Sequence, residues 1–142
     1  VMDLHPELFF FTPLIAAMAG NVGVQSSAII VQGLANNTII GPVVERLLKE
    51  LSLSLLNGVI LSVILLAGSY FLLGYEIHVG YTVSIALLSV IIMASLIGTF
   101  IPIILNKYGV DPALATGPFI TTSNDILGIL TYFTIAKIIL GI

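Results

Sequence analysis

Four long apolar stretches, at about residues 8–35, 51–73, 79–105 and 112–140, alternate with short segments that hold most of the charged residues. A helix needs about 20 apolar residues to cross the hydrocarbon core of a bilayer, so each stretch is long enough to span it. The pattern therefore predicts a single all-α domain: a polytopic membrane helix bundle with four transmembrane helices.

The first connector, residues 36–50, carries a helical pattern of its own. Pro42 suits the first turn of a helix, and apolar residues follow it at helical spacing as far as Leu51. Charged residues occupy the positions between them. We expect a short amphipathic helix here, lying at the membrane surface.

Basic residues are distributed unequally among the connectors. Arg46 and Lys49 lie in the first connector and Lys107 in the third, whereas the second, residues 74–78, has neither Lys nor Arg. The positive-inside rule then places the first and third connectors in the cytoplasm and both chain ends outside.

Composition supports a membrane protein and excludes several kinds of site. Of the 142 residues, 58% are hydrophobic and only 8% are charged, and the mean hydropathy is +1.21. Soluble domains carry about a quarter charged residues. Because there is no Cys, disulfides and thiolate metal sites are excluded, and two His give little support to a histidine metal site. No Gly-x-Ser-x-Gly or His-Glu-x-x-His motif points to an enzyme, and no nucleic-acid partner is expected.

Asp125 lies deep in the last apolar stretch, where a charge costs roughly 2.5 to 3.5 kcal/mol on insertion scales. Such an acid persists where it faces protein, water or a cation. On a helix, Thr121 lies one turn before Asp125 on the same face, and Thr122 adds a further hydroxyl. Oxygen atoms are the ligands of hard cations, so Asp125, Thr121 and Thr122 form a candidate metal site. Gly117-Pro118 interrupts the helical pattern just before them and frees a backbone carbonyl.

The middle of the first stretch, residues 19–27, is too rich in glycines and amides for a lipid-facing helix. Gly20 and Gly23 allow another backbone to approach closely, and Asn21 and Gln25 require polar partners. Two interpretations remain open: these residues hold helices together, or they line a polar cation path. The candidate lining residues for such a path are Gly20, Asn21, Gly23, Val24, Gln25 and Ser27 in this stretch, with Gly117, Pro118 and Asn124 in the last one.

Three acids lie where the mouths of such a path would be. Asp111 is at the expected cytoplasmic end, although it is equally well explained as the cap of the following helix. Asp3 and Glu7 are at the expected outer end, where they either concentrate cations or are merely solvated.

Two motifs carry a family resemblance: Ala19-Gly20-Asn21-Val22-Gly23-Val24-Gln25 in the first stretch, and Asp111 to Asp125, which reads DPALATGPFITTSND, in the last. With them the chain resembles the membrane domain of the MgtE magnesium channel and transporter family. The resemblance covers nearly the whole chain, which is similar to the second to fifth of that domain's five helices. It departs from the family at Ala19, where glycine is usual, and at Val24, where a polar residue is frequent.

The resemblance implies a homodimer in the cell membrane with an ion path at the interface between subunits. It also implies that Asp125 is the intramembrane aspartate that holds hydrated Mg²⁺ and that residues 21–27 line the path opposite it. Magnesium, or another divalent cation, is then the transported ion.

Two other functions remain compatible with the residues. An intramembrane carboxylate also suits proton coupling, so Asp125 could be the proton site of a secondary transporter. A non-transporting assembly subunit would use the glycines and amides for packing alone.

Overall fold

The computed structural model describes residues 5–38 and 42–141, and in these residues it contains helices and no strand. Two short helices and four long ones follow in the order α1 (Glu7–Phe10), α2 (Thr12–Ala35), α3 (Val43–Phe71), α4 (Ile77–Lys107), the 3₁₀ helix η1 (Pro112–Ala115) and α5 (Pro118–Leu140). Within the described part of the chain, four segments are long and apolar enough to cross a membrane: α2, most of α3, α4, and η1 together with α5. The predicted all-α bundle with four spans is confirmed, and the chain is an integral membrane protein.

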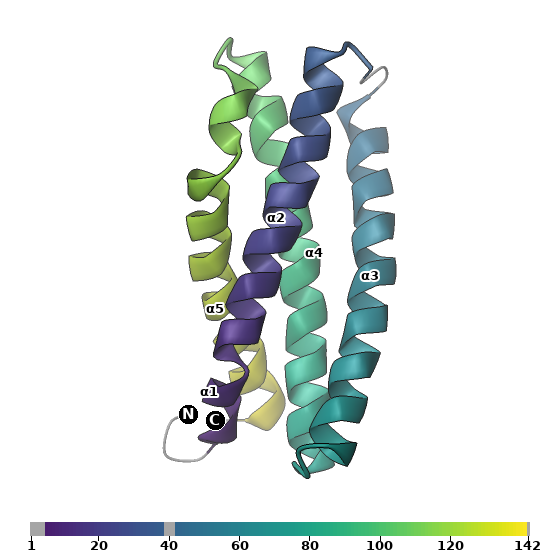
Figure 1. Cartoon of the computed structure of the whole chain (residues 1–142), viewed down its shortest axis with the longest axis vertical. Coiled ribbons are helices and arrows are strands. Elements are labelled where there is room, and N and C mark those ends of the chain that lie inside the picture. The colour runs from purple at the N-terminus through teal and green to yellow at the C-terminus, as the bar shows by residue number, and fades with distance from the viewer. Residues whose placement is uncertain (1–4, 39–41, 142) are drawn as a thin grey trace.

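The helices run along a common long axis (Figure 1). α4 lies at the centre of the bundle, since it packs against α2, α3 and α5, and α5 also packs against α2. α3 contributes little to the interior: many of its large apolar side chains are exposed, as expected for a helix that faces lipid. α2 and α5 therefore form one side of the molecule and α3 the opposite side.

The first predicted stretch is divided into α1 and α2. Pro13 lies at the second position of α2 and has no N–H to donate to the Phe9 carbonyl, so the helical hydrogen bonding is interrupted at this point. α1 is nevertheless fixed to the bundle, because Leu8 and Phe11 are buried and the Tyr132 hydroxyl donates to the Leu8 carbonyl at 2.8 Å.

The expected connector helix forms the first turns of α3 and is not a separate helix. Pro42 caps α3 in an extended conformation, and no Gly or Pro follows it until Gly58, so nothing interrupts the helix at the membrane boundary. Two ion pairs one turn apart support these turns: Lys49 Nζ to Glu45 Oε1 at 3.2 Å, and Arg46 Nη2 to Glu50 Oε1 at 3.0 Å.

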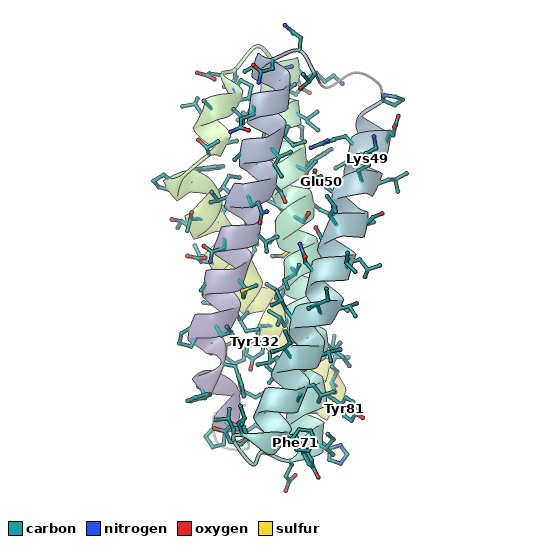
Figure 2. All side chains as sticks on the ribbon, turned by 45° about the vertical axis from the view of Figure 1, so that its right-hand side comes forward. Lys49, Glu50, Phe71, Tyr81 and Tyr132 are labelled. Atoms are coloured by element: carbon teal, nitrogen blue, oxygen red, sulfur yellow. The ribbon has the colours of Figure 1, made fainter. Side chains whose placement is uncertain are left out.

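The apolar core fills the half of the bundle that contains α1 and the loop between α3 and α4. Figure 2 shows Tyr132 within the bundle in this half, with Phe71 and Tyr81 near its end, while Lys49 and Glu50 lie toward the opposite end. Small and polar residues of α2, α4 and α5 gather between the apolar core and η1. That polar region contains the candidate site.

Candidate cation site at the contact of α2 and α5

Asp125 lies two turns into α5 and its side chain is half-buried against α2. Its Oδ1 atom is inaccessible and, among the described residues, has no hydrogen-bond partner. A methyl group added at Gly20 would lie only 2.7 Å from this oxygen, so the carboxylate lies directly against the backbone of α2 at this glycine. A buried carboxylate oxygen is stable only with a partner, so this oxygen is suited to a cation or a water molecule.

The two threonines predicted as ligands differ in their surroundings. Thr121 is half-buried, and both its backbone N–H and its hydroxyl donate to the Gly117 carbonyl, at 3.0 and 3.1 Å. Its hydroxyl oxygen can still accept a hydrogen bond. Thr122 is exposed on the surface of the bundle. A cation beside Asp125 could therefore use the Thr121 oxygen as it stands, whereas Thr122 faces away from the chain's own core.

The interruption predicted before α5 is present. Thr116 is extended, and Gly117 adopts φ +67°, a left-handed conformation that glycine accepts without strain. Pro118 has no N–H to donate to the Leu114 carbonyl one turn earlier. η1 and α5 are therefore two separate helical segments of the last span.

The nine residues predicted to line a path fall into two groups. Asn21 and Gln25 are exposed and Val24 is half-buried, and their spacing places all three on one face of α2; Gly117 and Pro118 are also accessible. Four others are buried inside the chain: Gly20, Gly23, Ser27 and Asn124.

Ser27 connects α2 to the interruption in the last span. Its hydroxyl donates to the Ala115 carbonyl at 2.6 Å, across 88 residues of sequence, and its side chain is fully buried. Asp111 acts at the other end of η1, where its Oδ1 accepts from the Ala113 N–H at 2.9 Å. The capping role expected for Asp111 is therefore present, and its side chain remains exposed.

At the opposite end of the bundle, Glu7 accepts a hydrogen bond from His5 Nδ1 at 2.8 Å. Burial raises the pKa of Glu7, but the bond from His5, the bond from its own backbone N–H and the charge of His5 together hold it below its usual value. Glu7 is thus half-exposed and is also paired with His5, so it is not merely solvated. Asp3 lies outside the described residues.

Comparison with known proteins decides which family these residues belong to. The family model described as "MgtE: Divalent cation transporter" matches residues 12–135, a range that includes α2, the interruption before α5, and Asp125. The chain belongs to the MgtE family. Its members are transporters of divalent cations, and the expectation of a transport protein agrees with this.

Several curated relatives are named magnesium transporter MgtE. The protein of Bacillus subtilis (strain 168) is 41% identical over 130 residues, which cover 91% of this chain and 29% of the relative. The protein of Thermus thermophilus is 33% identical over 141 residues, 99% of this chain and 31% of the relative. The protein of Enterococcus faecalis is 37% identical over 133 residues, 92% and 29% respectively. The chain thus spans about three-tenths of the length of these MgtE relatives.

One polar feature of this MgtE chain was missed in the sequence. A cavity of about 170 Å³ between α2 and α3 is lined by polar side chains, among them Gln25 of α2 and Glu50 and Asn57 of α3. Glu50 is 4% exposed and its charge is offset by Arg46. The signal was the spacing of Glu50, Ser54 and Asn57, which places three polar residues on one face of an otherwise apolar helix.

Proposed function

We propose that this protein moves largely hydrated Mg²⁺ across the cell membrane, through a path at the interface between two copies of the chain. Three features support the proposal: membership in the MgtE family, the unpaired Asp125 oxygen within a membrane span, and the accessible polar face of α2 beside it. The path is lined by α2 and α5 of each copy, with Asp125, Thr121 and Thr122 as the oxygen ligands.

The observation that carries the proposal is the environment of Asp125. A purely structural acid would be neutralised by a partner within the chain, as Glu50 is by Arg46 at 3.0 Å. Asp125 has no such partner in residues 5–38 and 42–141, and these residues contain no group of three or more His, Cys, Asp or Glu side chains that could hold a metal. A single chain therefore supplies one carboxylate, and a second copy would supply the other.

A pair of carboxylates facing each other across a dimer axis favours divalent ions. Two close carboxylates repel each other, so one tends to take up a proton, and a doubly charged cation between them removes this penalty. Mg²⁺ keeps several of its waters and is usually bound through one or two carboxylates. The path therefore needs groups that accept hydrogen bonds from these waters, and it does not need a full set of protein ligands around the ion. Asn21 on the accessible face of α2 is suited to that role.

In this proposal the accessible positions line the path, and they are fewer than the nine residues predicted from the sequence. Asn21 and Val24 line it from α2, with Gly117 and Pro118 near its cytoplasmic end, while Gln25 faces the cavity between α2 and α3. Asp111 lies at the cytoplasmic mouth and Glu7 at the outer one, in the orientation with both chain ends outside. Ser27 and Asn124 act inside the chain and support the residues that line the path.

Flux in reconstituted vesicles tests this function. Purified protein is placed in lipid vesicles that contain a Mg²⁺-sensitive dye, and external Mg²⁺ is added. We expect Asp125→Ala and Asp125→Asn to abolish uptake, because both remove the charge, while Glu76→Gln, a change of an exposed acid in the loop before α4, leaves uptake unchanged.

Two results would overturn the proposal. Uptake that survives Asp125→Asn would exclude the carboxylate as the ion ligand. Uptake of another solute that follows an imposed pH gradient and persists without Mg²⁺ would identify Asp125 as a proton site instead.

A further inference from the structure

Three helices meet at Gly23, and each contact there is closer than a side chain would allow. A methyl group added at Gly23 would overlap Asn124 Nδ2 of α5 and lie 2.8 Å from its Cγ. A methyl group added at Gly98 of α4 would overlap the Gly23 carbonyl oxygen. Gly23 is thus enclosed between the backbone of α4 on one side and the Asn124 amide on the other, and α2 has no room to move closer to either.

The Asn124 amide makes this contact by shape. The side chain is fully buried, and Nδ2 donates to the Ile120 carbonyl at 3.0 Å, within its own helix. Oδ1 is buried and has no hydrogen-bond partner in the part of the chain that the structure describes. No hydrogen bond joins the Asn124 side chain to α2 among these residues, so the amide acts on α2 through its volume alone.

Asn124 and Asp125 are adjacent on α5 and face successive glycines of α2. Asn124 lies against Gly23, and Asp125 lies against Gly20 one turn away. Neighbouring side chains on a helix point about 100° apart, so the rotation of α5 that seats Asn124 at Gly23 also directs Asp125 to Gly20. A small rotation of α5 would move both side chains together.

We propose that Asn124 is a positioning residue: its bulk, seated against Gly23, sets the rotation of α5 and thereby holds the Asp125 carboxylate at Gly20. The consequence for transport rests on the proposed function, while the interlock itself does not. On this account the amide acts through its size, whereas a residue that lines the path would act through its polar atoms.

A size exchange between the two helices separates these roles. Asn124→Ala removes the bulk, Gly23→Ala adds bulk on the facing side, and the double variant moves a comparable volume from α5 to α2. We expect Asn124→Ala to raise the Mg²⁺ concentration for half-maximal uptake by about tenfold, the loss expected for a weakened contact to a charged oxygen. The double variant should return this Mg²⁺ concentration to within about twofold of the value for the unaltered protein, a difference of less than about 0.5 kcal/mol. Ser123→Ala, one position earlier on α5, serves as the control and should leave it unchanged.

Thermal unfolding of the same proteins in detergent provides a readout that does not depend on transport. We expect each single variant to unfold at a lower temperature and the double variant to recover most of the loss, which is the non-additivity of residues in contact. Additive effects would overturn the interlock. If the unfolding temperatures are non-additive but Asn124→Ala leaves the Mg²⁺ concentration for half-maximal uptake unchanged, the positioning role would be overturned. A double variant with uptake as impaired as that of Asn124→Ala would also overturn it. Absence of uptake by the unaltered protein would refute the proposed function, and the unfolding data would still decide the interlock.

Discussion

The contact of α3 with α4 and the contact of α2 with α5 are built in the same way but contain different side chains. In each contact, glycines of both helices admit side chains of the facing helix. Between α3 and α4, a methyl group at Gly58 would meet Leu88 at 2.6 Å, and one at Gly80 would meet Ser69 and Leu66 at 2.8 and 2.9 Å. Between α2 and α5, Gly20 and Gly23 of α2 face the Asp125 carboxylate and the Asn124 amide, and a methyl group at Gly128 of α5 would meet Ala19 Cβ of α2 at 2.7 Å.

The chemistry of the admitted side chains distinguishes packing from function. Ser62 donates across the α3–α4 contact to the Ser84 carbonyl at 2.9 Å, and the remaining side chains there are largely apolar, apart from the neutral Ser84 hydroxyl, which has no partner among the described residues. The α2–α5 contact instead encloses Asp125 Oδ1 and Asn124 Oδ1, neither of which has a partner among the described residues. Glycine spacing alone therefore predicts that helices approach closely, and the side chain opposite the glycine shows what the approach serves.

The largest effect should come from closing the point where two backbones touch. Gly98→Ala would place a methyl group on the Gly23 carbonyl, and neither backbone can move aside. We expect a loss of about 3 kcal/mol or more, at the upper end for overpacked positions, with protein that fails to unfold cooperatively in detergent.

Gly68→Ala is the matched control for Gly98→Ala. Gly68 lies within α3, and a methyl group there would meet nothing within 4 Å. Because alanine favours a helix over glycine by about 1 kcal/mol, this variant should unfold at the same or a higher temperature. A normal melting curve for Gly98→Ala would refute the close backbone contact.

The architecture could be predicted from the sequence because each span satisfies a length and hydropathy condition on its own. The four spans, the interruption at Gly117-Pro118 and the cap at Asp111 all follow from local rules. The continuous α3 follows from a local rule as well, because no residue at 50–51 breaks the helix, and the expectation of a separate connector helix was wrong for this reason.

The sequence predicted which residues form the candidate site but not which way their side chains face. Asp125 stands out as an acid in an apolar span, yet the sequence does not show that its side chain packs against Gly20 of α2. Asn21 and Asn124 look equivalent as polar residues, but the first is exposed and the second is fully buried. That difference depends on the rotation of α2 and α5 about their axes, which is set by contacts between distant residues.

A second, smaller effect should distinguish the two glycine contacts by function. In Gly20→Ala the new methyl group would meet the end of the Asp125 side chain, which can rotate away, so the fold should tolerate the change. The displaced carboxylate should raise the Mg²⁺ concentration for half-maximal uptake by about tenfold.

Gly80→Ala crowds side-chain ends at a similar distance in the α3–α4 contact. It should lower the unfolding temperature without changing that concentration. Equal effects of the two variants on uptake would show that the α2–α5 contact has no special role.

The smallest effect should separate two buried hydroxyls that each bond to another element. Ser27 donates to the Ala115 carbonyl at 2.6 Å and Ser62 to the Ser84 carbonyl at 2.9 Å. Ser27→Ala leaves the buried Ala115 carbonyl without its donor and should lose about 1 to 3 kcal/mol of stability. Ser62→Ala should lose less, about 0.5 to 1.5 kcal/mol, because the Ser84 carbonyl keeps its hydrogen bond within α4. Only Ser27→Ala should also alter Mg²⁺ uptake, because the Ala115 carbonyl lies just before the interruption that leads into α5 and Asp125. Ser27→Thr retains the hydroxyl and should restore uptake, whereas equal uptake by Ser27→Ala and Ser62→Ala would limit Ser27 to packing.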